Sequence, residues 1–96
     1  ITKSGFSARL VSSYRPSMPV FAVTTEQTTF RQLAAVWGVH PVLAEDVEVT
    51  YEELSDVGMQ SVLEAGVGEK GASVAITAGF PFHQIGSTNN MRLDRL

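Results

Sequence analysis

The chain has 96 residues, 44% of them hydrophobic, which suffices for one domain with a modest core. Its net charge of −3 argues against a nucleic-acid surface, since such a surface needs clustered Lys and Arg, and the absence of cysteine excludes disulfides and cysteine-based zinc sites. No apolar run approaches the roughly 20 residues of a membrane span, and the first residues lack a signal-peptide pattern, so we expect a cytoplasmic protein without membrane partners.

The first predicted elements are a helix and a strand. Residues 6–14 place apolar side chains at helical spacing, and the helix ends before Pro16 because a residue that precedes proline is pushed out of the helical region. Residues 19–25 then form a short, continuously apolar run. Such a run is typical of a buried strand in a parallel sheet.

A second helix–strand pair follows. Thr24 or Thr25 caps a helix over residues 26–38 that ends at Gly38. Its apolar side consists of Phe30, Leu33, Ala34 and Trp37. Helical spacing therefore predicts Trp37 as a core residue rather than a stacking platform. Residues 39–45 read as another buried strand, in which we expect His40 to be packed rather than to bind a ligand.

The second half continues the alternation. Thr50 and Glu53 form a capping box at the start of a helix over residues 50–65. A glycine-rich turn then precedes residues 73–79, which form the most strand-like segment of the chain. Residues 91–96 alternate apolar and charged side chains, as an edge strand does.

This alternation predicts one α/β domain over residues 1–96: a three-layer sandwich, with a mainly parallel sheet, helices on both faces and a C-terminal edge strand. Ligands of such sheets sit beyond the carboxyl ends of the strands. Two hydroxyl-rich loops would meet there, residues 2–7 and residues 79–87.

The opening residues have the chemistry of an anion site. Hydroxyls, one amine and a glycine gather just where a helix exposes free backbone amides. These residues are Thr2, Lys3, Ser4, Gly5 and Ser7. The alternative is a simple helix N-cap, since Ser and Gly are common before any helix.

Six motifs, in order and at matching spacing, resemble the C-terminal domain of pyruvate kinase. They are a Thr-x-Ser-Gly turn, a helix that closes with Tyr-Arg-Pro, a Val-Thr strand end, an Arg-Gln-Leu helix running into Trp-Gly-Val-x-Pro-Val, an Ile-Thr-x-Gly strand end, and Gly-x-Thr-Asn. The matches run from Thr2 to about Leu93.

The resemblance implies that this chain is an N-terminally clipped piece of a larger enzyme. The barrel that carries the catalytic residues and the metal ions is absent, so we expect no catalytic residue, cofactor or metal site here. Conversion of phosphoenolpyruvate and ADP to pyruvate and ATP, with magnesium and potassium, would belong to the parent chain. The carboxylates lack a calcium-loop pattern, and His83 has no carboxylate or second histidine beside it.

The resemblance also implies a phosphorylated effector. Thr2, Lys3, Ser4 and Ser7 would contact its phosphate, and Gly5 would admit close backbone approach. The effector loop would close over the sugar. That loop contains Gly79, Phe80, Pro81, Phe82, His83 and Gly86, and it departs from family versions rich in Gly and Arg.

The segment from Glu45 to Asp56 departs further from the family. Members that bind fructose 1,6-bisphosphate hold its second phosphate there with a Trp and an Arg, whereas this chain has six carboxylates and no Arg, Lys or Trp. We therefore expect a monophosphate, of a sugar or a nucleotide, rather than a bisphosphate.

The edge strand at the C-terminus is the candidate self-association surface. In the family the C-terminal domains of neighbouring subunits pack together, and here Met91, Leu93 and Arg95 are the interface candidates. The alternative is an edge covered by its own charged side chains, Arg92, Asp94 and Arg95.

Three functions are consistent with these observations. The first is a regulatory, effector-binding and subunit-interface domain of a pyruvate kinase. The second is a free-standing, non-catalytic domain that binds a phosphorylated metabolite. The third is a small α/β hydrolase or phosphatase with Ser4 or Lys3 catalytic.

Overall fold

The computed structural model describes residues 1–79 and 90–96. Its helices are α1 (Phe6–Ser13), α2 (Gln27–Leu33) and α3 (Tyr51–Ala65), and its strands are β1 (Val20–Thr24), β2 (Val39–Leu43), β3 (Ser73–Ala78) and β4 (Asn90–Arg95). Every helix and strand predicted from the sequence is present. Among the described residues, no helix is both long and apolar enough to cross a membrane.

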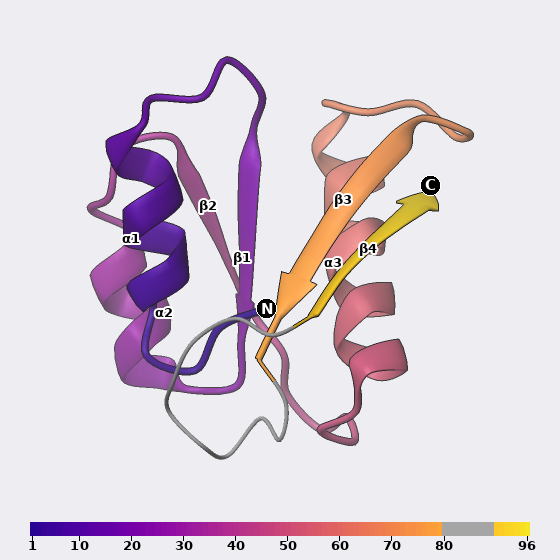
Figure 1. Ribbon diagram of the computed structural model, residues 1–96. Coiled ribbons are helices and arrows are strands. Elements are labelled where there is room, and N and C mark those ends of the chain that lie inside the picture. The colour runs from indigo at the N-terminus through magenta and orange to yellow at the C-terminus, as the bar shows by residue number, and fades with distance from the viewer. Residues whose placement is uncertain (80–89) are drawn as a thin grey trace.

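The strands form two pairs. β1 and β2 are parallel, with Val20 opposite Val39, and β3 and β4 are antiparallel, with Ala75 opposite Leu93. Helices α1 and α2 lie on one side of β1 and β2, and α3 lies on the other side, next to β3 and β4 (Figure 1). The α/β fold is therefore confirmed, with one parallel and one antiparallel pair among the described strands.

Two small apolar clusters fill the space between these layers. The first joins α1 and α2 to the sheet and centres on Leu33, which is fully buried. The second joins α3 to the other face of β1 and centres on Leu54, also fully buried. Burying each leucine contributes about 1.5–3 kcal/mol, so the two clusters hold the helical layers onto β1 and β2.

The third helix begins as the sequence predicts. Thr50 is its N-cap, and the Thr50 Oγ1 accepts a hydrogen bond from the Glu53 amide at 3.2 Å. Gly66 ends the helix in the left-handed region, at φ +72°, which a residue without a side chain adopts at little cost.

The second helix is shorter than its sequence pattern predicts. It ends at Leu33, five residues before Gly38, so residues 34–38 leave the helical spacing. Trp37 is consequently 50% exposed, and the prediction that it is a core residue is wrong. The Arg15 guanidinium lies over its ring, 4.6 Å from the centroid.

His40 also differs from expectation. It is exposed rather than packed in a core, and its ring stacks on Phe21 of the neighbouring strand with 4.9 Å between centroids. Strand alternation explains this position, because Val39 and His40 point to opposite faces of the sheet and Val39 takes the buried one.

Candidate functional site

The loop of residues 2–7 starts between the two strand pairs, and its last two residues form the beginning of α1 (Figure 1). The Ile1 amine donates to the Thr77 carbonyl of β3, and the Thr2 amide donates to the Val23 carbonyl of β1, both at 2.9 Å. Thr77 and Val23 are the next-to-last residues of their strands. The loop therefore lies at the carboxyl ends of β1 and β3, the edge where the sequence predicts ligand binding.

The first turn of the loop is closed from within. Thr2 is buried, and its Oγ1 accepts a hydrogen bond from the Gly5 amide at 2.8 Å. Gly5 is the N-cap of α1 and has φ +84°, a conformation that favours glycine. The Thr2 hydroxyl and the Gly5 amide thus hold the loop in shape, while no side chain of the N-cap residue caps α1.

The second helix, α2, contacts this loop through Thr29 and Leu33. Thr29 donates its hydroxyl hydrogen to the Lys3 carbonyl at 2.7 Å. A Cβ atom on Gly5 would lie 3.1 Å from Leu33 Cδ2 and 3.3 Å from Thr29 Cγ2, which is closer than side chains usually pack. The buried face of α2 therefore fixes the position of the whole N-terminal loop.

Three further polar residues of the loop are partly accessible to solvent. Ser4 and Ser7 are half-buried, and the Ser4 Oγ accepts from the Phe6 amide at a long 3.4 Å. Lys3 is half-buried as well. The start of α1, these two serines and this lysine are the groups that could receive an anion.

The sequence reasoning missed one cation, Arg9. Its Nη2 donates to the Ser4 carbonyl at 3.3 Å, and its Nη1 lies 3.4 Å from where a Cβ of Gly5 would be. The guanidinium therefore lies against the loop rather than away from it. The spacing from Gly5 to Arg9 is four residues, one helical turn, and that spacing could have revealed the contact.

The acidic segment lies at the same edge of the sheet. It follows β2, and its Val47 packs against the cluster of Leu54, as Ile1 does. All six of its carboxylates belong to exposed residues: Glu45, Asp46, Glu48, Glu52, Glu53 and Asp56. Within residues 1–79 and 90–96, no three Asp, Glu or His side chains are grouped closely enough to hold a metal ion.

The proposed effector loop is described only at its first residue. Gly79 is half-buried and follows β3, two residues after Thr77. The other predicted residues of this loop, Phe80, Pro81, Phe82, His83 and Gly86, lie outside the described residues.

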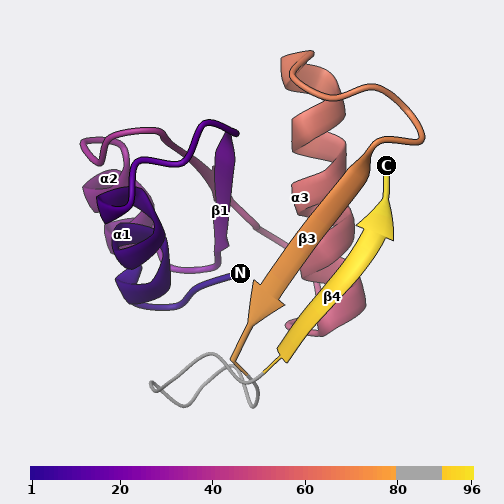
Figure 2. The same ribbon diagram turned by 45° about the horizontal axis from the view of Figure 1, so that its top comes forward.

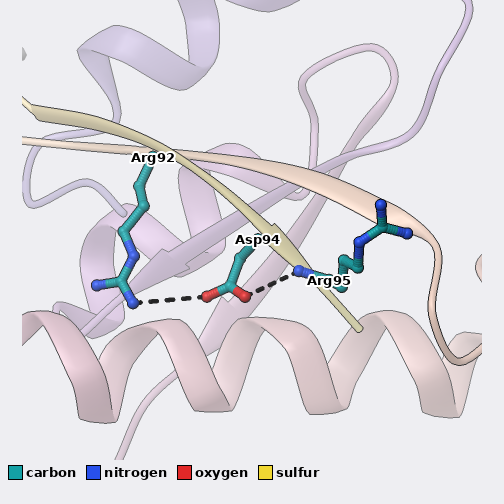
Figure 3. A network of polar contacts seen from close by, with 3 residues as sticks. All are labelled: Arg92, Asp94 and Arg95. Atoms are coloured by element: carbon teal, nitrogen blue, oxygen red, sulfur yellow. Dashed lines mark hydrogen bonds and ion pairs between the residues drawn. The ribbon is translucent and has the colours of Figure 1, made fainter.

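Alternation along the last strand places Met91, Leu93 and Arg95 on one face and Arg92 and Asp94 on the other. Met91 and Leu93 are 72% and 76% exposed. On the other face, Arg92 and Asp94 lie on the α3 side and form an ion pair of 3.8 Å (Figure 3). The Arg95 Nη1 donates to the Gly71 carbonyl at 3.2 Å. The charged side chains therefore do not cover Met91 and Leu93.

Comparison with known proteins decides the family. Residues 1–93 match the family described as "Pyruvate kinase, alpha/beta domain". The chain belongs to this family.

Its relatives include the pyruvate kinases of Agrobacterium vitis, Clostridium acetobutylicum and Geobacillus stearothermophilus, which are 40%, 41% and 40% identical to it over 92 residues. The match covers 96% of this pyruvate kinase domain but only 19%, 19% and 16% of the relatives. The domain thus spans less than a fifth of the length of these enzymes.

Proposed function

We propose that this chain is the regulatory domain of a pyruvate kinase and binds a phosphorylated effector at the loop of residues 2–7. The observation that carries the proposal is the contact of the Arg9 guanidinium with the Ser4 carbonyl at the start of α1, in a stretch that also contains Lys3 and Ser7. Two cations, two hydroxyls and a helix N-terminus are complementary to a phosphate group.

The effector in this proposal carries one phosphate. The exposed carboxylates between Glu45 and Asp56 follow β2 at the same edge of the sheet as the loop. A second phosphate that reached this segment would meet like charge, and the segment has no Arg or Lys to pair with it. A sugar or nucleotide monophosphate avoids this repulsion.

In this proposal catalysis belongs to other parts of a cytoplasmic parent enzyme. The magnesium and potassium ions, the phosphoenolpyruvate site and the catalytic residues would all lie outside these 96 residues. The domain would contribute effector binding and, through the exposed Met91 and Leu93 of β4, contact with a neighbouring subunit.

A thermal-shift screen tests effector binding. Ribose 5-phosphate, AMP, fructose 1,6-bisphosphate and inorganic phosphate are each added to the 96-residue chain and to its Lys3→Ala and Ser4→Ala variants. A ligand at 100 times its Kd stabilises the native state by about 2.7 kcal/mol, which raises the melting temperature by several degrees. We expect a monophosphate to do this, and both variants to lose most of the shift.

The matched controls are Lys70→Ala and Ser13→Ala. Lys70 is the other lysine of the chain, and it is exposed in the turn before β3. Ser13 is exposed at the end of α1, where its hydroxyl donates to the Leu10 carbonyl. Both controls should keep the full shift. A larger shift with the bisphosphate would contradict the proposed effector class, and no shift with any ligand would contradict effector binding.

A further inference from the structure

Helix α1 turns its small side chains toward the sheet and its large ones toward solvent. Ala8 and Ser12 are its buried residues. Phe6, Leu10 and Tyr14 are 61%, 49% and 80% exposed, and their four-residue spacing places them along one face of the helix, called the α1 face below. A helix usually buries its large apolar side chains against its own domain, so packing within the described part of the chain does not account for the α1 face.

Positive charges border the α1 face. Arg9 and Arg15 are both exposed, and Arg9 follows Phe6 by three residues, which places it next to the apolar row. The Arg15 guanidinium lies over the Trp37 ring, and the Trp37 carbonyl accepts a hydrogen bond from the Ser12 hydroxyl at 2.5 Å. A cation and a half-exposed aromatic ring therefore lie beside the C-terminal end of α1.

Charge is divided unequally along the chain. Residues 1–40 contain four of the seven Lys and Arg residues but one of the ten Asp and Glu residues. Figure 2 shows α1 and α3 on opposite sides of β1, and the exposed carboxylates of α3 are thus separated from the α1 face by the sheet. The α1 face lies on the basic side of the domain, and carboxylates on a partner would complement it.

The acidic helix of a second copy does not fit the α1 face. The exposed residues of α3 are polar or small: Glu52, Glu53, Asp56, Gln60, Glu64 and Ala65. This surface could pair with Arg9 and Arg15, but it would offer no large apolar side chain to the α1 face. A complementary partner needs apolar residues and carboxylates on the same surface.

We propose that the α1 face is a docking surface for an acidic amphipathic helix of a partner protein. Apolar residues of that helix, repeated every three or four positions, would pack along the row formed by Phe6, Leu10 and Tyr14. Its Asp and Glu residues would pair with Arg9 and Arg15. Docking of this kind goes beyond effector binding and needs no ligand at residues 2–7.

Fluorescence anisotropy of a labelled synthetic peptide tests this docking surface. The acidic peptide repeats the heptad Leu-Glu-Glu-Leu-Leu-Glu-Glu, and its basic twin has Lys at every Glu position, so the two share their apolar spacing and differ in charge. We expect the 96-residue chain to bind the acidic peptide at least about tenfold more tightly than the basic one. The affinity for the acidic peptide should fall as salt is added, because salt screens exposed charges.

Two variants locate the binding on α1. Leu10→Ser removes an apolar contact, and Arg15→Gln removes one positive charge. Their matched controls, Val67→Ser and Lys70→Gln, make similar changes in the turn between α3 and β3, where Val67 is 48% exposed against 49% for Leu10. Leu10→Ser should weaken binding of the acidic peptide by about tenfold and Arg15→Gln by about threefold, whereas each control should change it by less than about twofold.

Several results would overturn the proposal. They are the absence of binding, equal affinity for the two peptides, and equal losses in the α1 variants and their controls. Sedimentation of the chain with phosphatidylserine vesicles, abolished by Leu10→Ser, would instead assign the α1 face to a lipid surface. Self-association abolished by Leu10→Ser would assign it to a second copy of the chain.

Discussion

At the scale of single residues, Gly5 does most to shape the candidate site. It combines a left-handed backbone with close contact to Leu33 and Thr29 of α2. Either property alone disfavours a side chain, and together they fix the turn that presents Ser4 and Ser7 at the start of α1.

Replacement of Gly5 by alanine tests both properties against a matched control. Gly38 also has a positive φ, +69°, but has nothing within 4 Å of an added Cβ. We expect Gly38→Ala to lower the free energy of unfolding by about 1 kcal/mol from the backbone term, and Gly5→Ala to lower it by about 2–3 kcal/mol because overpacking adds to strain. Urea denaturation measures both values. Equal losses would mean that the contact with α2 contributes nothing.

Residue-scale expectations for Trp37 and His40 failed for two different reasons. A periodic pattern identifies the buried face of a helix only along the residues that are helical. Because α2 ends before Trp37, the pattern does not apply to Trp37. His40 lies within its strand, but a continuously apolar run does not say which face of the sheet is covered at that end. The helical spacing of Arg9 from Gly5 places it near the loop, but its contact with the Ser4 carbonyl also depends on the side-chain conformation, which the sequence does not give.

At the scale of elements, the sequence predicted every described helix and strand. Each element was predicted from local signals, namely apolar runs, Pro16, Gly66 and the Thr50 cap. Such signals act within a few residues, so they suffice to predict individual helices and strands. The interruption of the sheet between β1 and β3 was not predicted, because strand pairing is a long-range property. The contacts of the loop after Gly79 lie outside the described residues.

The β4 element carries the self-association proposal. Leu93 is 76% exposed on this terminal strand, whereas Leu10 is 49% exposed on α1. If β4 is the interface, Leu93→Lys should shift the sedimentation coefficient toward that of a monomer, because a buried charge opposes pairing. Leu10→Lys should leave association unchanged. A chain that is monomeric at every concentration, or equal effects of the two variants, would contradict the assignment.

At the scale of the whole molecule, the Ile1 amine links the two strand pairs. Its pKa is lowered by burial to about 6 in the folded chain, so between pH 6 and 8 the unfolded chain binds more protons. The free energy of unfolding should therefore rise with pH over this window, by about 2 kcal/mol. Well below pH 6 the amine is protonated in both states, and its contribution no longer changes with pH.

Acetylation of the amine supplies the control for this prediction. The acetylated chain has no titrating group at Ile1, and its unfolding free energy should lack this rise between pH 6 and 8. The difference between the two chains isolates the contribution of the amine from that of every other titrating group. Parallel pH profiles for the free and acetylated chains would show that the amine is not buried in solution.

Phosphate binding at the start of α1 is the central feature of the proposed function. The most direct measurement is an amide chemical-shift titration of the 96-residue chain with ribose 5-phosphate, with unphosphorylated ribose as the control. We predict saturable shifts at Lys3 to Ser7 that ribose does not cause, with little change at Gly66 or Gly71, the turn glycines that precede β3. Shifts scattered over the chain, or none at Lys3 to Ser7, would contradict the assignment of this loop as an effector site.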